Sequence, residues 1–266
     1  MTAMQTSARL RPAAAAWPPG AIVGVVIGWI TLVLAIDAHG DRVTQRLLGF
    51  GTWLVLAAIL SREPGLVRAQ TAVVVVFATL VEYTCSPLLG VYLYRFHNVP
   101  AYVPPGHGLV YLAALAIGRM AYVRAHERLC MVAVLLGVGG YAAYGLFVSA
   151  RLDVLGAFWF ACLAGFLLWG PSRGLYIGAA VVVTYLEIVG TSVGTWEWQP
   201  QDPTGLVAIG NPPSGAAGGY GWFDLAALLL APTITAAFAR ATSRGLPPAG
   251  GGADARAEVS RAEARD

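Results

Sequence analysis

Long apolar runs, separated by short polar segments, dominate the chain between residues 20 and 240. Most of these runs approach the length of about 20 residues that an α-helix needs to cross a bilayer. The pattern predicts eight spans, near residues 20–37, 46–61, 70–91, 107–123, 129–149, 153–170, 174–195 and 222–240. We therefore expect an all-α fold, a polytopic membrane helix bundle of about eight transmembrane helices.

The two ends of the chain lack such runs. Residues 1–19 are polar and rich in Ala and Pro, and residues 242–266 are Gly/Pro-rich and then charged. Segments of this composition bury too little apolar surface to fold alone. The sequence predicts a disordered N-terminal tail at 1–19, a transmembrane bundle at 20–241 and a disordered cytoplasmic tail at 242–266.

The composition agrees with a membrane location, since 57% of residues are hydrophobic and 12% are charged. Soluble domains average about 25% charged residues. If the N-terminus is cytoplasmic, the 17 basic residues fall on the cytoplasmic side with four exceptions, Arg42, Arg46, Arg95 and Arg151. Positive charge concentrates on the cytoplasmic side of membrane proteins. We expect an integral protein of the bacterial plasma membrane with both termini in the cytoplasm.

A polar motif occurs twice, at the ends of the third and seventh predicted spans. In each copy an intramembrane glutamate is followed by a glycine, two aromatic residues spaced by two, a Pro-Pro loop and the sequence Leu-Ala-Ala-Leu. The first copy contains Thr79, Glu82, Gly90, Tyr92, Tyr94 and Leu112, and the second contains Thr184, Glu187, Gly194, Trp196, Trp198 and Leu225. This order indicates an internal duplication, with parallel four-helix repeats at about 20–123 and 129–240, and one polar site built from both.

The glutamates are the strongest candidates for chemistry. A carboxylate inside a span costs a few kcal/mol on insertion scales and usually faces the bundle interior. Glu82 and Glu187 lie at similar depth, and a pair that holds one proton offers an acid and a base. The alternative is a structural hydrogen-bond pair, with Thr79 and Thr184 as partners.

The aromatic residues Tyr92, Tyr94, Trp196 and Trp198 have two interpretations. Tyr and Trp gather at membrane interfaces, so these four could form part of an aromatic belt. They could equally form a wall around an apolar or cationic species, because aromatic faces attract cations.

Other polar residues lie near the Pro-Pro loops. His107 and Asp224 begin the fourth and eighth predicted spans, and both are candidates for further acid/base groups. Asp224 could instead complement the start of its helix. Asn211 could hydrogen-bond a ligand or cap its loop. We also assign Thr79 and Thr184 as candidate substrate-binding residues.

No metal site or cofactor is predicted. His97 and His107 lack a carboxylate at ligand spacing, and Cys85, Cys130 and Cys162 form no Cys-x-x-Cys pair. A nucleotide-binding glycine loop, a Walker motif and a basic patch for nucleic acid are all absent from the sequence. The expected partners are membrane lipids and a lipid-soluble small molecule.

The two motif copies resemble the membrane family of carotenoid biosynthesis proteins that includes the carotenoid 1,2-hydratases. The similarity lies in an intramembrane glutamate followed by Gly-x-Tyr-x-Tyr and a proline-bearing loop, here Glu82, Gly90, Tyr92, Tyr94, Pro104 and Pro105. The second copy has tryptophans in place of the tyrosines. The resemblance implies the addition of water to a terminal isoprenoid double bond, and it extends distantly to the small membrane terpene cyclases.

The favoured hypothesis is an integral membrane enzyme that performs acid/base chemistry, hydration or cyclisation of a terminal double bond, on an isoprenoid or carotenoid-like substrate. A proton- or ion-coupled transporter or channel that uses the Glu82/Glu187 pair is the alternative. A structural subunit of a membrane complex is a third possibility.

Overall fold

The computed structural model describes residues 16–244, so the predicted tails lie almost wholly outside the described residues. Its long helices are α1 (Pro19–Asp37), α2 (Arg42–Leu60), α3 (Gly65–Tyr83), α4 (Val103–Arg119), α6 (Glu127–Phe147), α7 (Val154–Trp169), α8 (Arg173–Ser192) and α9 (Ala216–Arg244). The shorter elements are the π-helix η1 (Thr84–Leu88), the helix α5 (Ala121–Ala125) and the strands β1 (Tyr92–Tyr94) and β2 (Trp196–Trp198). Over residues 16–244 the fold is all-α apart from this strand pair and an isolated bridge between Gln201 and Ala208, as the apolar pattern predicts.

Six helices among the described residues are long and apolar enough to cross a membrane. They are α1, α2, α3 with its η1 extension, α6, α8 and α9. The predicted spans at 107–123 and 153–170 correspond to α4 and α7, which are 17 and 16 residues long. These two helices are shorter than the six candidate spans. The length and apolar composition of the six are those of an integral membrane protein.

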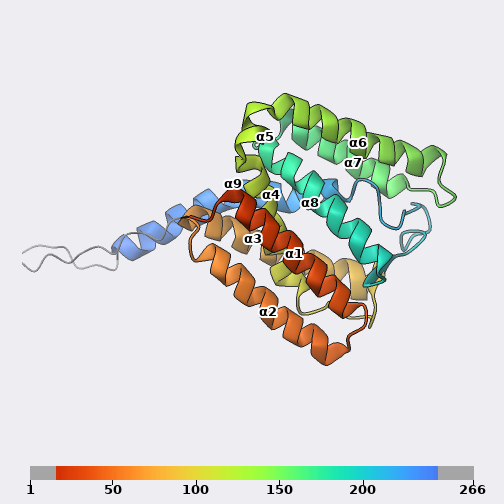
Figure 1. Cartoon of the computed structure of the whole chain (residues 1–266), viewed down its shortest axis with the longest axis horizontal. Coiled ribbons are helices and arrows are strands. Elements are labelled where there is room, and N and C mark those ends of the chain that lie inside the picture. Colours follow the sequence, from red (N-terminus) through yellow and green to blue (C-terminus); the bar gives the residue numbers. More distant parts are fainter. Residues whose placement is uncertain (1–15, 245–266) are drawn as a thin grey trace, which may run out of the picture.

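Helix α4 lies in the middle of the bundle, with α1 and α2 on one side and α6 and α7 on the other (Figure 1). It packs against α1, α2, α3 and α8, and most of its residues are buried. Helix α8 packs closely on α4 because small residues meet there. A Cβ atom at Gly178 would lie 2.1 Å from the carbonyl oxygen of Ala114, so glycine permits this approach of the two backbones.

The four helices around the centre of the bundle pack in a symmetric pattern. Helix α3 contacts α4 and α9, and helix α8 contacts α9 and α4. The connections that follow α3 and α8 both lie at the end of the bundle opposite the protruding C-terminal end of α9 (Figure 1). Both motif copies therefore reach the same end of the molecule.

The two aromatic segments form an antiparallel strand pair, in which Tyr92 lies opposite Trp198 and Tyr94 opposite Trp196. Gly90 and Gly194 precede the strands with φ angles of 65° and 74°. This left-handed conformation suits glycine, because a Cβ atom would be strained there. In the first copy, α3 continues through the π-helical η1, which contains Pro87, before it reaches this turn. The glycines therefore permit the turn from helix to strand in both copies.

The long loop after β2 is fastened to the start of α7. The buried carboxylate of Asp153 accepts hydrogen bonds from the backbone N–H groups of Gly156 and Gly210, both at 2.9 Å, and of Ser214 at 2.7 Å. Arg151 donates to the backbone carbonyl oxygen of Ile209 at 2.7 Å. Neither residue belongs to a recognisable sequence pattern, yet both hold the segment that leads into α9.

We expect Asp153→Asn to lower the thermal stability of the protein in detergent. The amide has one acceptor oxygen, so at least one buried N–H group loses its partner, which costs about 1–3 kcal/mol. Asp202→Asn is the matched control, because Asp202 also accepts from backbone N–H groups, in an exposed turn where water can replace it. Equal decreases in the unfolding midpoint for the two variants would contradict the proposed anchoring role.

Candidate functional site

A cavity of about 260 Å³ lies beneath the strand pair, near the lower size limit of small-molecule sites. Its walls are mainly apolar and aromatic, with two carboxylates and a histidine among them. The lining residues are Phe77, Val81, Glu82, Cys85, Val91, Tyr92, Tyr94, His107, Trp159, Glu187, Trp196, Trp198, Ala216, Gly219, Tyr220, Trp222 and Phe223. Both motif copies contribute to it, so the structure brings the two predicted glutamates to one space.

Glu82 is buried, with 6% of its surface exposed. Its Oε2 atom accepts hydrogen bonds from the hydroxyl groups of Tyr92 and Tyr94, each at 2.9 Å. Its Oε1 atom lies 3.4 Å from Nε2 of His107. One oxygen is thus fully engaged by phenols, and the other faces an imidazole.

Glu187 has the corresponding arrangement with indoles in place of phenols. Its Oε2 atom accepts hydrogen bonds from Nε1 of Trp196 and of Trp198, each at 3.1 Å. It is also buried, with 4% of its surface exposed. The exchange of Tyr-x-Tyr for Trp-x-Trp between the copies therefore preserves the donors while changing their chemistry.

The strand geometry explains this arrangement. Side chains two residues apart on a strand point to the same face, so both aromatics of each strand turn toward the bundle interior. The rings also pack across the pair, with centroids 4.5 Å apart for Tyr92 and Trp198 and 6.1 Å apart for Tyr94 and Trp196. All four side chains are buried. They form the wall of a cavity rather than an interfacial belt.

His107 also lines the cavity and stacks on Tyr220 of α9. The ring centroids are 5.2 Å apart and the planes differ by 15°. Nδ1 of His107 lies 3.0 Å from the carbonyl oxygen of Val103, which orients the imidazole. Sequence reasoning missed Tyr220, although a signal existed. His107 and Tyr220 each stand five residues before a Leu-Ala-Ala-Leu sequence, at Leu112 and Leu225.

Asp224 is buried but is not among the residues that line this cavity. It lies well inside α9, which begins at Ala216, so it does not complement the helix start as the sequence suggested. It lies within electrostatic range of the phenols of Tyr111 and Tyr176. Within the described part of the chain, its Oδ2 atom and both of these hydroxyl groups have no hydrogen-bond partner. They form a separate buried polar group.

Three other predicted residues, and His97, have local roles or lie away from the cavity. Asn211 accepts a hydrogen bond from the backbone N–H of Trp198 at 3.1 Å, and so fixes its loop to β2. The hydroxyl of Thr79 donates to the carbonyl oxygen of Val75 in its own helix, at 2.6 Å. Neither Thr79 nor Thr184 lines the cavity, and aromatic donors occupy the positions expected for them beside the glutamates. His97 lies in a turn with a φ angle of 53°.

Sequence reasoning also missed Trp159 of α7, whose indole packs edge-on against Trp198 with centroids 5.6 Å apart. A single tryptophan in an apolar run has no distinguishing pattern, so only the fold reveals it. Asp37, at the end of α1, was likewise missed. It accepts a hydrogen bond from the hydroxyl of Tyr102 at 2.8 Å and so anchors the loop before α4.

Comparison of the chain with models of known protein families, with curated proteins and with solved structures gives no match.

The strand tyrosines should remain protonated in strongly alkaline solution. Burial, and then the charge of Glu82, raise the pKa of the Tyr92 and Tyr94 phenols well above the ordinary tyrosine value. We expect the ultraviolet tyrosinate signal of wild type to match that of a Tyr92→Phe/Tyr94→Phe variant while both proteins stay folded. Above the ordinary pKa the unfolded chain releases these protons and the folded chain retains them, so the free energy of unfolding should fall as pH rises. A larger tyrosinate signal in folded wild type than in the folded double variant would contradict the raised pKa values.

Proposed function

We propose that the protein is an integral membrane enzyme that performs acid/base chemistry on a lipid-soluble, isoprenoid-like substrate. The observation that supports this most directly is the presence of two buried glutamates on one apolar cavity. Each is held by two aromatic donors through a single oxygen atom. The reaction that fits the site and the motif resemblance is hydration of a terminal double bond. Cyclisation begins with the same protonation.

In this mechanism one glutamate is protonated and donates its proton to the terminal carbon of the alkene. The electron pair of the double bond forms the new C–H bond and leaves a tertiary carbocation. A water molecule adds its oxygen to the cation, and the second glutamate takes the surplus proton. Return of that proton to the first glutamate completes the cycle. General acid–base catalysis of this kind contributes about 10²–10⁴-fold in rate.

The arrangement of the donors supports this division of labour. The phenols and indoles bind Oε2 of the two glutamates, so Oε1 of each is the atom assigned to proton transfer. The ring faces of Trp159, Trp196 and Trp198 border the same space and would stabilise a carbocation through cation–π attraction. His107 is assigned to hydrogen-bond Oε1 of Glu82 and so to position that proton.

Access from the bilayer fits the location of the cavity. Phe77 of α3 and Trp222 of α9 line it and are 37% and 49% exposed on the surface of the bundle. Helices α3 and α9 pack side by side, so these residues mark a lateral route between the cavity and the lipid phase. A lipid-soluble substrate could enter there without crossing water.

The duplication provides the framework for this proposal. We assign α1 to α4 and α6 to α9 as parallel four-helix repeats that cross the membrane eight times. The antiparallel pairing of β1 with β2 and the equivalent packing of α3 and α8 support a two-fold relation between them. His107 stacks on Tyr220 at the equivalent position of the other copy.

Coupled transport is the second candidate function. Asp224, Tyr111 and Tyr176 are buried polar groups on the central helices, outside the cavity. Ionisable residues inside a membrane commonly mark ion or proton pathways. In that case Glu82 and Glu187 would bind the coupling ion, and the protein would release no altered product.

The first test replaces each glutamate with glutamine. We expect Glu82→Gln and Glu187→Gln each to abolish product formation while the protein still folds, because the amide oxygen accepts the aromatic hydrogen bonds but the group no longer transfers a proton. Lipid extracts of cells with and without the protein, analysed by mass spectrometry, identify the product. A hydration product gains the mass of one water molecule and incorporates oxygen from labelled water.

Glu197→Gln is the matched control, since Glu197 lies on β2 between the two site tryptophans and is exposed. It should leave product formation unchanged. Full activity in both site variants would remove the glutamates from the mechanism. Proton-coupled uptake by the reconstituted protein, without any altered lipid, would favour the transporter.

The second test concerns orientation. In a protein whose native cysteines are replaced by serine, Leu206→Cys should react with a membrane-impermeant maleimide added outside intact cells, because Leu206 is 85% exposed in the loop before α9. Ala125→Cys, on α5 at the opposite end of the bundle, should react only after the membrane is opened. The reverse labelling would overturn the topology derived from the arginine distribution.

A further inference from the structure

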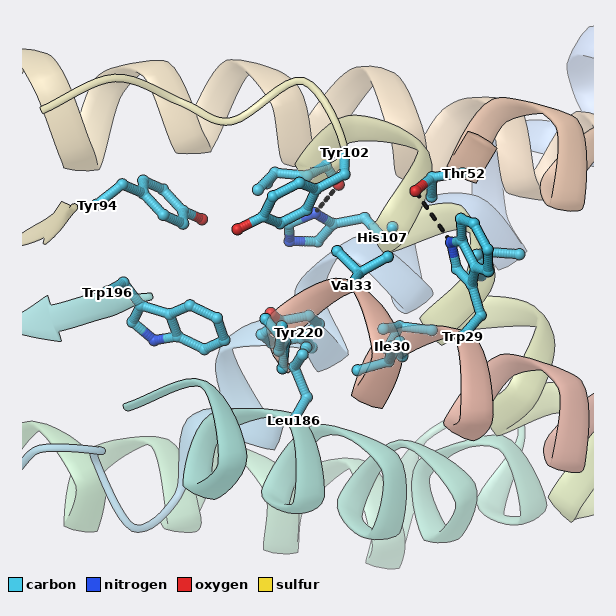
Figure 2. Close-up of a pocket in the computed structure, with 15 residues that line it drawn as sticks. Trp29, Ile30, Val33, Thr52, Tyr94, Tyr102, His107, Leu186, Trp196 and Tyr220 are labelled. Carbon is cyan, nitrogen blue, oxygen red and sulfur yellow. Dashed lines mark hydrogen bonds between the residues drawn. The ribbon is translucent and has the colours of Figure 1, made fainter. Parts of the chain in front are cut away.

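A second, smaller cavity of about 60 Å³ adjoins the carboxylate cavity between α1, α4 and α8. The two cavities share four lining residues, Tyr94, His107, Trp196 and Tyr220. Figure 2 shows Tyr94 and Trp196 facing each other at one end of this space, and Trp29 and Thr52 at the other. We call this second space the α1–α4–α8 pocket.

The pocket has an apolar interior. Its walls beyond the shared residues are mainly aliphatic, formed by Ile30, Val33, Leu34, Leu109, Val110 and Leu186. Several of the polar groups nearby are already paired. Nε1 of Trp29 donates to Oγ1 of Thr52 at 3.0 Å, and that hydroxyl donates to the carbonyl oxygen of Leu48 at 2.7 Å. The hydroxyl of Tyr102 is bound to Asp37.

A ligand with several polar or charged groups would lose its hydration in such a space and find few free partners, which is unfavourable. A hydrocarbon chain has no hydrated polar groups to lose, and its burial in an apolar space is favourable. A volume of about 60 Å³ favours a slim extended chain over a bulky ring system. The lining therefore selects a linear hydrocarbon.

We propose that the α1–α4–α8 pocket binds the hydrocarbon chain of a lipid-soluble ligand and directs the end of that chain into the carboxylate cavity. The identification of that end as the reacting end rests on the proposed function. The binding site itself rests on the continuity of the two cavities and on the apolar lining.

Helix α1 separates this pocket from the surface of the bundle. Val33 points into the pocket and is 4% exposed (Figure 2), whereas its neighbour Leu32 is 49% exposed. The seam between α1 and α8 is crossed by a side-chain hydrogen bond of 2.5 Å between Oγ1 of Thr31 and the hydroxyl of Tyr185. The two adjacent positions on α1 thus provide an inward substitution and an outward control.

The experiment uses photolabelling of the full-length protein in lipid nanodiscs. The probes are geranylgeraniol and palmitic acid, each with a diazirine group on the chain, and labelled residues are located by mass spectrometry. We expect labels on the lining residues of α1, α4 and α8, and a several-fold loss of this labelling in Val33→Trp, whose indole fills the pocket. Leu32→Trp should label like wild type. Val110→Phe, on α4, is the second inward variant if Val33→Trp fails to fold.

Competition with unlabelled geranylgeraniol or with excess phospholipid shows whether an isoprenoid or an acyl chain is the preferred occupant, and either result supports a hydrocarbon site. Absence of pocket labels with both probes, or equal labelling in wild type and folded inward variants, would overturn the proposal. The Glu82→Gln variant should retain the photolabelling of the pocket residues. If that variant is labelled but remains fully active, the pocket stands and the proposed role of this glutamate fails.

Discussion

The structure depends on the hydrogen bonding of two carboxyl groups buried in an apolar helix bundle. A buried carboxyl group without partners costs several kcal/mol, so Glu82 and Glu187 each require hydrogen-bond donors. Phenols and indoles on a short strand supply them. These side chains combine a hydrogen-bond donor with a large apolar body, so they satisfy the carboxyl groups and line an apolar space at once.

The need for these donors explains the irregular end of the bundle. The two aromatic side chains of each copy reach one carboxylate because the chain changes from helix to strand within a few residues, at the left-handed glycines. Each strand alone would expose its backbone, but paired together they satisfy each other. The loops around them are held from outside, by Arg95 on the backbone carbonyls of Ala38 and Gly40 and by Asp153 on the loop before α9.

The same arrangement gives the two glutamates different surroundings, which suits the proposed acid/base pair. The two glutamates are equivalent in the motif, but one is held by phenols beside an imidazole and the other by indoles. These different donors would let the two groups take opposite roles in the proposed reaction. An adjoining hydrocarbon pocket would place a substrate between them without polar anchoring groups, which suits a molecule that has none.

The sequence by itself determined the helical membrane-type fold, the two glutamates and the aromatic residues near them, because apolar run length and an out-of-place charge are local signals. It also indicated that the site would combine two distant segments, through the repeated order of residues. Only the tertiary structure decided that Tyr92, Tyr94, Trp196 and Trp198 are the hydrogen-bond donors, that Thr79 and Thr184 are not, and that Asp224 is buried apart from the cavity. Hydrogen-bond partners depend on how strands pair and helices pack, and residues such as Trp159 and Asp153 join the structure through contacts that no local pattern records.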